Sequence, residues 1–172
     1  MKNKIIDYND LEKIRKKHQN IVFCSGCFDV LHSGHAYFFK QCKEFGDVLV
    51  VDVGSDKVIK SLKGLERPIN SQNNRVYLIS AFQDVDYAII GGEEVIDGKI
   101  DFKEIMEKLK PDIFVLNDDD SAIEQKRRLC NELGVEMKMV SRVLPDFLKM
   151  ISSTEIIKKG EKDVRNSWNL EL

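Results

Sequence analysis

The sequence predicts an α/β fold, a three-layer α/β/α sandwich built on a five-stranded parallel sheet. Short apolar runs alternate along the chain with segments whose apolar side chains recur at helical spacing, and this alternation is typical of parallel sheets. One run, Val48–Val51, is continuously apolar, as expected of a strand that helices cover on both faces. The expected strands are Ile21–Cys24, Asp47–Gly54, Tyr87–Ile90, Ile113–Leu116 and Val135–Val140.

The segments between these strands carry signals for the start and the end of helices. Ser121 with Glu124, and Ser152 with Glu155, match the Ser-x-x-Glu capping box, and Gly134 is a typical C-terminal cap. The expected helices are Leu11–His18 capped by Asp10, the segment after His35 that carries Phe38, Cys42 and Phe45, Ser71–Phe82, a helix capped by Asp101 and stopped by Pro111, Ala122–Leu133, and a last helix that Gly160 ends.

The composition limits the class of protein. A chain of 172 residues is long enough for one domain with a sizeable core. Its net charge of −2 gives no basic excess, so we expect no nucleic-acid partner, and no apolar stretch approaches membrane-spanning length, so we expect no membrane partner. The N-terminus lacks the apolar core of a signal peptide and the four cysteines are scattered, which together favour a reducing cytoplasm.

Two further features bear on organisation. Cys24 and Cys27 have C-x-x-C spacing, but Cys24 belongs to a strand and no second ligand pair exists, so zinc or redox use is disfavoured. We expect residues 1–160 to form the domain and residues 161–172 a C-terminal tail. The tail is mostly polar, with Trp168 and Leu170 among its few apolar residues, and it fits either a loose extension or the contact of a homodimer.

The segment Gly26–His35 carries the strongest functional signal. It holds His32 and His35 around Gly34, and it lies where a buried strand leads into a helix. Such a junction points free backbone N–H groups and a positive helix end at its ligand, and therefore favours phosphate. Histidines that merely satisfy a helix start are the alternative, but a pair at this junction favours phosphate chemistry. A metal site is disfavoured because no third imidazole or paired cysteine is suitably spaced.

Three other segments could complete a phosphate site. Lys149 precedes three hydroxyls, Ser152–Thr154, at a helix start, which could hold a triphosphate or simply provide a cap. Lys60–Arg67 follows the second strand as an expected loop with three cations and a glycine; it fits a mobile clamp for an anionic substrate or a solvated charged loop. Asn117–Asp120 ends the fourth strand and fits a turn, or carboxylates that orient a hydroxyl or help to hold Mg²⁺.

The motif Gly-x-Phe-Asp-x-x-His-x-Gly-His at 26–35, with Ser152–Thr154 near the end, resembles the cytidylyltransferase-like nucleotidyltransferase superfamily over most of residues 10–160. Ser25–Asp29, Leu62–Gly64, Arg67–Asn70, Arg75 and Ser152–Lys159 are similar to the nucleotidyltransferase domain of ADP-heptose synthase, while the histidine motif and Asp118-Asp119 are similar to glycerol-3-phosphate cytidylyltransferase. The chain departs from both branches in its last third, from the heptose branch at Asn117-Asp118 and from the cytidylyl branch at Pro145–Met150, and this region helps to read the base in this superfamily.

The resemblance implies a Rossmann-like fold and transfer of CMP or AMP from CTP or ATP to a phosphorylated small molecule, such as a sugar phosphate or glycerol phosphate, with release of pyrophosphate. It implies Mg²⁺ carried by the triphosphate rather than by protein ligands. By the resemblance, the catalytic residues are His32, His35 and Lys63; the nucleotide-binding residues are Gly26, Cys27, Phe28, Gly34, Asn117, Asp118, Ser152, Ser153 and Thr154; the substrate-binding residues are Asp29, Lys60, Arg67 and Arg75.

Two rival interpretations are weaker. A non-catalytic nucleotide-sensing domain would share the fold, but the intact His32, His35, Lys63 and Ser152 argue against a decayed site. A fragment of a class I aminoacyl-tRNA synthetase would share a similar histidine motif and a loop that Lys149–Ser153 partly echoes. The short chain and the absence of a basic face argue against that second rival.

Overall fold

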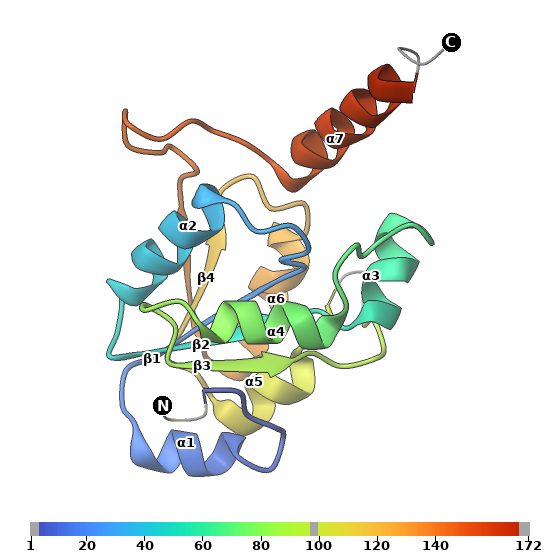
Figure 1. Cartoon of the computed structure of the whole chain (residues 1–172). Helices are drawn as coiled ribbons and strands as arrows, with labels where there is room; N and C mark the ends of the chain where they lie inside the picture. Colours follow the sequence, from blue (N-terminus) through green and yellow to red (C-terminus); the bar gives the residue numbers. More distant parts are fainter. Residues whose placement is uncertain (1–3, 97–99, 169–172) are drawn as a thin grey trace.

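The computed structural model describes residues 4–96 and 100–168, with side chains up to residue 162 (Figure 1). Its centre is a five-stranded, all-parallel sheet in the order β3-β2-β1-β4-β5, which confirms the expected fold class. The strands are β1 (Ile21–Gly26), β2 (Val48–Val53), β3 (Tyr87–Ile90), β4 (Ile113–Asn117) and β5 (Glu136–Val140).

Helices cover both faces of the sheet, and each face has its own apolar core. On one face, α1 (Leu11–Lys17), α5 (Lys103–Leu109) and α6 (Ile123–Leu133) pack on alternate strand residues such as Phe23, whose ring contacts Phe102 and Phe114. On the other face, α2 (Ser33–Lys43) and α4 (Gln72–Ser80) pack on the intervening strand residues. The alternation follows from the two-residue period of a strand, and burial on both sides explains the continuously apolar runs.

The strand order places a switch point beside β1. The chain runs outward from β1 to β2 and β3, then returns to β4 on the other side of β1. In open parallel sheets the loops on either side of such a point diverge, and ligands bind outside the carboxyl ends of the strands there. The segment Gly26–His35 leaves β1 at this point.

The structure corrects the expectation of a loop after the second strand. An additional helix, α3 (Asp56–Lys63), contains both Lys60 and Lys63, and only the segment from Gly64 onward is irregular. The helix forms because the Ser55 hydroxyl caps it by accepting a hydrogen bond from the Val58 amide, and because its apolar side chains are buried. The charged side chains of α3 lie on its solvent side, so this segment has the composition expected of an exposed loop.

Three of the expected caps are wrong in detail. Ser121 does not cap α6; Asp120 instead accepts a hydrogen bond from the Ala122 amide at 2.8 Å. Asp101 makes no side-chain cap for α5, and Asp10 makes none for α1, where it pairs with Lys13. Lys13 engages the Asp10 carboxylate, and Asp101 is largely buried beside the cavity, so neither side chain reaches the free amides. The expected cap at Gly134 is confirmed, with a left-handed φ of 68°.

The last helix, α7 (Ser153–Trp168), starts as expected but does not end at Gly160. Ser152 and Glu155 form the reciprocal capping box, with hydrogen bonds of 2.7 and 3.2 Å. A glycine within a helix costs only about 1 kcal/mol relative to alanine, so the helix passes through it. Figure 1 shows α7 projecting from the body of the molecule. Leu170, a candidate for a dimer contact in the tail, lies outside the described residues.

Within the described ranges, none of the helices combines the length and apolarity needed to span a bilayer.

Candidate active site

The turn after β1 is built around the buried ring of Phe28. This residue has a left-handed backbone, with φ of 48°, and its ring packs on those of His35 and Phe39 at centroid distances of 5.4 and 5.2 Å. A Cβ atom at Gly26 would lie 2.8 Å from the Phe28 ring, so only glycine leaves room for it. Gly26 and Phe28 therefore shape the turn that carries the histidines.

His32 and His35 form a stacked pair at the start of α2. Their ring centroids are 3.9 Å apart with planes at 27°, and both Nδ1 atoms are buried without a hydrogen-bond partner within the described residues. A Cβ atom at Gly34 would sit 3.0 Å from His32 Nδ1, so the glycine lets the ring lie against the backbone. Unpartnered buried nitrogens in a polar site are expected to be completed by a ligand.

Burial and nearby positive charges keep both imidazole rings neutral. Burial lowers the pKa of His35 to about 3, and the positive charges of Arg142 and Lys63 act in the same direction. Burial and Arg142 also lower the pKa of His32, although Glu155 opposes that shift. A phosphate anion would reverse these effects, because a nearby negative charge favours the imidazolium form.

The hydroxyl-rich start of α7 lies against the same turn. Ser153 Oγ donates a 2.7 Å hydrogen bond to the carbonyl of Val30, and Glu155 is close enough to influence His32. The fold therefore brings together the two motifs that the sequence places at opposite ends of the chain. Ser152 serves the capping box, and Thr154 is exposed.

Lys63 and Lys60 lie one turn apart on α3, and both are exposed. Lys63 is close enough to lower the pKa of His35, and it lines the cavity described below. The structure thus places Lys63, from α3, together with the histidine pair.

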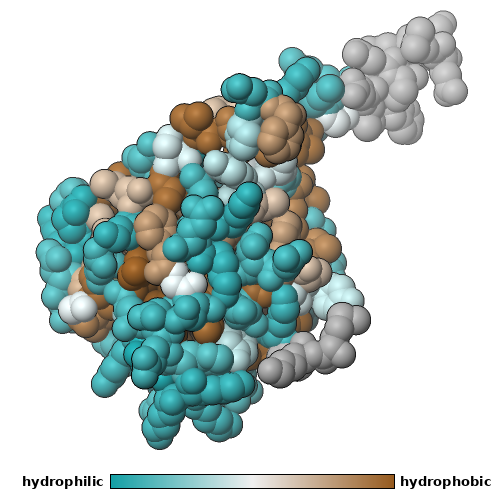
Figure 2. All heavy atoms as spheres, turned by 90° about the vertical axis from the view of Figure 1, so that its left-hand side faces the viewer, coloured by the Kyte–Doolittle hydropathy of each residue, from teal (hydrophilic) through white to brown (hydrophobic). Residues whose placement is uncertain are grey.

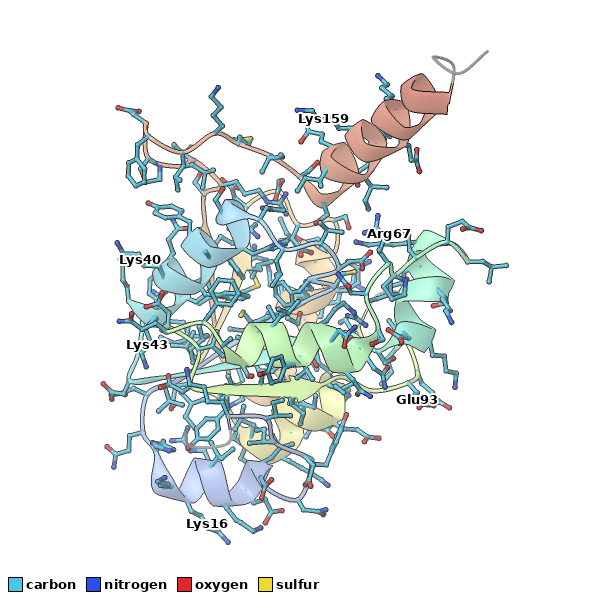
Figure 3. All side chains as sticks on the ribbon, viewed as in Figure 1. Lys16, Lys40, Lys43, Arg67, Glu93 and Lys159 are labelled. Carbon is cyan, nitrogen blue, oxygen red and sulfur yellow. The ribbon has the colours of Figure 1, made fainter. Side chains whose placement is uncertain are left out.

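Asp29 and Arg67 are engaged with each other. Asp29 is 2% exposed and accepts hydrogen bonds from Arg67 Nε at 2.6 Å and from the Asn70 amide at 2.9 Å. Burial raises the pKa of Asp29, but the bonds from the Asn70 and Ile69 amides and from Arg67 lower it overall. Figure 3 shows Arg67 in the segment between α3 and α4. This pair ties that segment to the turn after β1.

Arg75 has a different place from the other cations. Its side chain is fully buried, and it donates to the carbonyls of Asn70, Cys27 and Gly54 and to Asp56 at 2.7–2.9 Å. These partners come from the ends of β1 and β2, the start of α3 and the segment before α4. We therefore assign Arg75 to holding these four segments together rather than to contacting a substrate.

The acidic segment after β4 is largely paired with cations. Asp119 pairs with Arg142 at 2.9 Å, and Asp120 with Lys126 at 2.8 Å. Asn117 ends β4, and the backbone of Asp118 donates to Val140. Sequence reasoning missed Arg142, which lies directly after β5 and lowers the pKa of both histidines. Arg142 follows the carboxyl end of a parallel strand, where ligands bind in such sheets, and this position could have identified it from the sequence.

An open cavity of about 310 Å³ lies beside these groups, at the carboxyl ends of β1 and β2. Its walls come from the end of β1, from α3 and from the start of α6, and its polar lining includes Cys27, Asp52, Lys63, Asp101 and Lys126.

Comparison with known proteins places the chain in a family. A family model described as cytidylyltransferase-like matches residues 23–159. The chain belongs to this family. It is 36% identical to the bifunctional protein HldE of Nitratiruptor sp. over 90% of its length and 38% identical to HldE of Helicobacter pylori over 87%. It spans about a third of the length of these curated relatives, 31% and 29%.

Solved structures agree with this assignment. A lipopolysaccharide core biosynthesis protein of Thermoplasma volcanium is 34% identical, with a TM-score of 0.58 over 73% of this chain and 98% of that one. A pantoate-beta-alanine ligase of Francisella tularensis, at 17% identity and a TM-score of 0.62 over 88% of this chain and 74% of that one, shares the fold. The resemblance inferred from the histidine and Ser/Thr motifs is confirmed at the level of the family.

The two cysteines of the C-x-x-C spacing lie in different environments. Cys24 is buried in the core, where burial and a hydrogen bond with Cys42 raise the pKa of its thiol, and Cys27 lines the cavity. Within residues 4–96 and 100–168, no group of three or more His, Cys, Asp or Glu side chains is arranged to hold a metal ion.

Proposed function

We propose that the chain transfers a nucleotidyl group, CMP or AMP, from CTP or ATP to a phosphorylated small molecule and releases pyrophosphate. The observation that carries this proposal is the buried histidine pair, which lies against the hydroxyl-rich start of α7 and within electrostatic reach of Lys63. Family membership supports the reaction class.

The reaction requires no protein nucleophile. An oxygen of the acceptor phosphate forms a bond to the α-phosphorus, the bond from that phosphorus to the α,β-bridging oxygen breaks, and pyrophosphate leaves with the electron pair. His32 and His35 stabilise the charge that develops on the α-phosphate and the departing oxygen. Lys63 bridges the acceptor phosphate and the α-phosphate, and the α7 hydroxyls hold the β- and γ-phosphates. Catalysis is then positioning plus charge stabilisation.

Mg²⁺ bound to the triphosphate would neutralise part of its charge. Arg142 contributes a further positive charge next to the histidines, where it adds attraction for the polyphosphate.

A pyrophosphate-release assay tests the proposal with CTP or ATP, each combined with Mg²⁺ and with sugar 1-phosphates, glycerol 3-phosphate or ethanolamine phosphate. We expect release with one nucleotide and one acceptor class. The proposal fails if every pair is silent while CTP or ATP still raises the melting temperature of the protein, since a ligand that binds the folded state stabilises it. That result would identify a binding domain without turnover.

A further inference from the structure

The cavity floor contains a carboxyl group that the proposed reaction does not use. Asp52, in β2, is fully buried, lines the cavity, and has no hydrogen-bond partner for either carboxylate oxygen within the described residues. A buried polar group left unpaired costs on the order of 1–3 kcal/mol, and such groups in native proteins call for an explanation. A ligand that reaches the cavity floor would supply the missing partners.

A second acid, Asp101, lies beside Asp52. Asp52 Oδ1 and Asp101 Oδ2 both lie against the backbone of Gly91, where a Cβ atom would meet them at 2.8 and 3.0 Å, so the absence of a side chain lets the two acids approach the same point. Burial and the charge of Asp101 raise the pKa of Asp52 well above its ordinary value, and burial raises the pKa of Asp101 to about 6. Near neutral pH the pair therefore shares a proton and offers both a donor and acceptors.

Lys126 sets the chemistry of what can bind there. It is 6% exposed, pairs with Asp120, lies over the rings of Phe102 and Phe114, and lowers the pKa of both cavity acids. Its charge is balanced by Asp120 and the two cavity acids, and among the residues that the structure describes no group of three or more His, Cys, Asp or Glu side chains could hold a metal ion there. A hydroxyl is uncharged and both donates and accepts hydrogen bonds, so it matches this mixed donor and acceptor floor.

We propose that Asp52 and Asp101 bind hydroxyl groups of the acceptor, which makes the acceptor a polyhydroxylated phosphate of the sugar type. The carbon skeleton would occupy the cavity, with its phosphate at Lys63, which lines the same cavity. This inference rests on the proposed function because it places the acceptor of that reaction. It assigns specificity to two residues that lie outside the histidine, lysine and Ser/Thr motifs.

Kinetics with the isosteric Asp52→Asn and Asp101→Asn variants test the inference. The acceptors are a hexose 1-phosphate, its deoxy analogues, glycerol 3-phosphate and ethanolamine phosphate. We expect KM for the hexose phosphate to rise by at least about tenfold in Asp52→Asn, the size of one lost charge-assisted hydrogen bond, while KM for the nucleotide is unchanged. At least one deoxy analogue should show a much smaller rise, since it lacks the hydroxyl that the carboxyl binds.

Asp86→Asn is the matched control, because Asp86 precedes β3 at the opposite end of the sheet and bonds Lys43 and the Leu49 amide. It should leave the preference for hydroxylated acceptors intact. Equal KM changes for hexose and deoxy acceptors in both cavity variants would overturn the inference while pyrophosphate release upheld the proposed function.

Calorimetry separates the two proposals when turnover is absent. Hexose 1-phosphate is titrated into the protein together with a non-reactive α,β-methylene analogue of CTP or ATP. Binding that Asp52→Asn weakens, without pyrophosphate release from any pair, would uphold the hydroxyl-binding role of Asp52 and refute the proposed reaction. Lack of binding by every hydroxylated phosphate would overturn the inference.

Discussion

The imidazole rings of His32 and His35 stack at 3.9 Å, and neither Nδ1 atom finds a partner among the described residues. Two imidazolium rings at that distance would repel each other, so the free protein holds both rings neutral. The site is thus prepared for an anion that brings the opposite charge, and its histidines are expected to gain protons when a polyphosphate binds.

Nucleotide binding should therefore take up protons. The triphosphate opposes the burial and the positive charges that lower the pKa values of His32 and His35, so the pair takes up protons on binding near pH 6.5. Titration calorimetry in buffers of different ionisation enthalpy measures this uptake. The double variant His32→Asn/His35→Asn should abolish the uptake, and His35→Asn alone should lower kcat by at least about a hundredfold, as for a lost oxyanion donor. His18→Asn, which alters a histidine bonded to Tyr87, is the control and should leave both unchanged.

The same shift makes stability depend on pH. His35 titrates near its ordinary value of about 6.5 in the unfolded chain and at about 3 when folded, so the unfolded state binds more protons between these values. The contribution of His35 to stability is present above pH 6.5 and is lost as the pH falls toward 3. Urea titrations between pH 7.5 and 5 should show a shallower decline in the free energy of unfolding for His35→Asn than for the wild type. Parallel curves would contradict the assignment.

Much of the fold could be predicted because four of the five strands carry a continuously apolar run and the helices between the strands are periodic. The parts that were missed have physical reasons. Helix α3 is rich in charge on its solvent side, and only the Ser55 cap and two buried side chains mark it as a helix. The C-terminal helix continues because one glycine costs less than the hydrogen bonds on either side supply.

The candidate site, too, could be predicted from the sequence only in part. The histidine and Ser/Thr motifs were visible in the sequence because their residue types are unusual at a strand-to-helix junction. Asp52 was also visible, as a lone acid inside an apolar strand, but Asp101 joins it only through tertiary folding. Arg75 is a residue type that often binds anionic ligands. Only the folded structure shows that its side chain is buried and that it donates to three backbone carbonyls and Asp56.

Arg142 should control the charge state of His32. It lowers the pKa of that histidine and is held by Asp119, so Arg142→Ala should raise the His32 pKa in an NMR titration of the imidazole protons. The same variant should raise KM for the nucleotide by about tenfold, because it removes a positive charge from the polyphosphate site. Arg127→Ala removes an exposed arginine that pairs with Glu124 on α6 and should change neither quantity. A His32 pKa that stays constant in Arg142→Ala would exclude the interaction.

Arg75 should matter for stability before it matters for binding. Arg75→Ala leaves three backbone carbonyls, the buried one of Gly54 among them, and Asp56 without their donor, which we expect to cost at least about 3 kcal/mol of unfolding free energy. Arg75→Lys restores the charge but not the fork of donors, so it should recover only part of the loss. Urea unfolding measures both variants. A loss below 1 kcal/mol, combined with a large rise in acceptor KM, would instead return Arg75 to the substrate-binding residues.

Lys63 and Lys60 offer a matched pair on one helix, since both are exposed lysines near its C-terminal end. Lys63 lines the cavity and lies near His35, so Lys63→Ala should lower kcat/KM for the acceptor by about tenfold to a hundredfold, as expected for a lost charged contact in the transition state. Lys60→Ala should change it less than threefold. Lys63→Ala should also raise the pKa of His35, because one of the positive charges that lower it is gone. Equal kinetic losses in the two variants would show that the general charge of α3, rather than the position of Lys63, attracts the substrate. An unchanged His35 pKa would show that Lys63 does not act on the histidine pair.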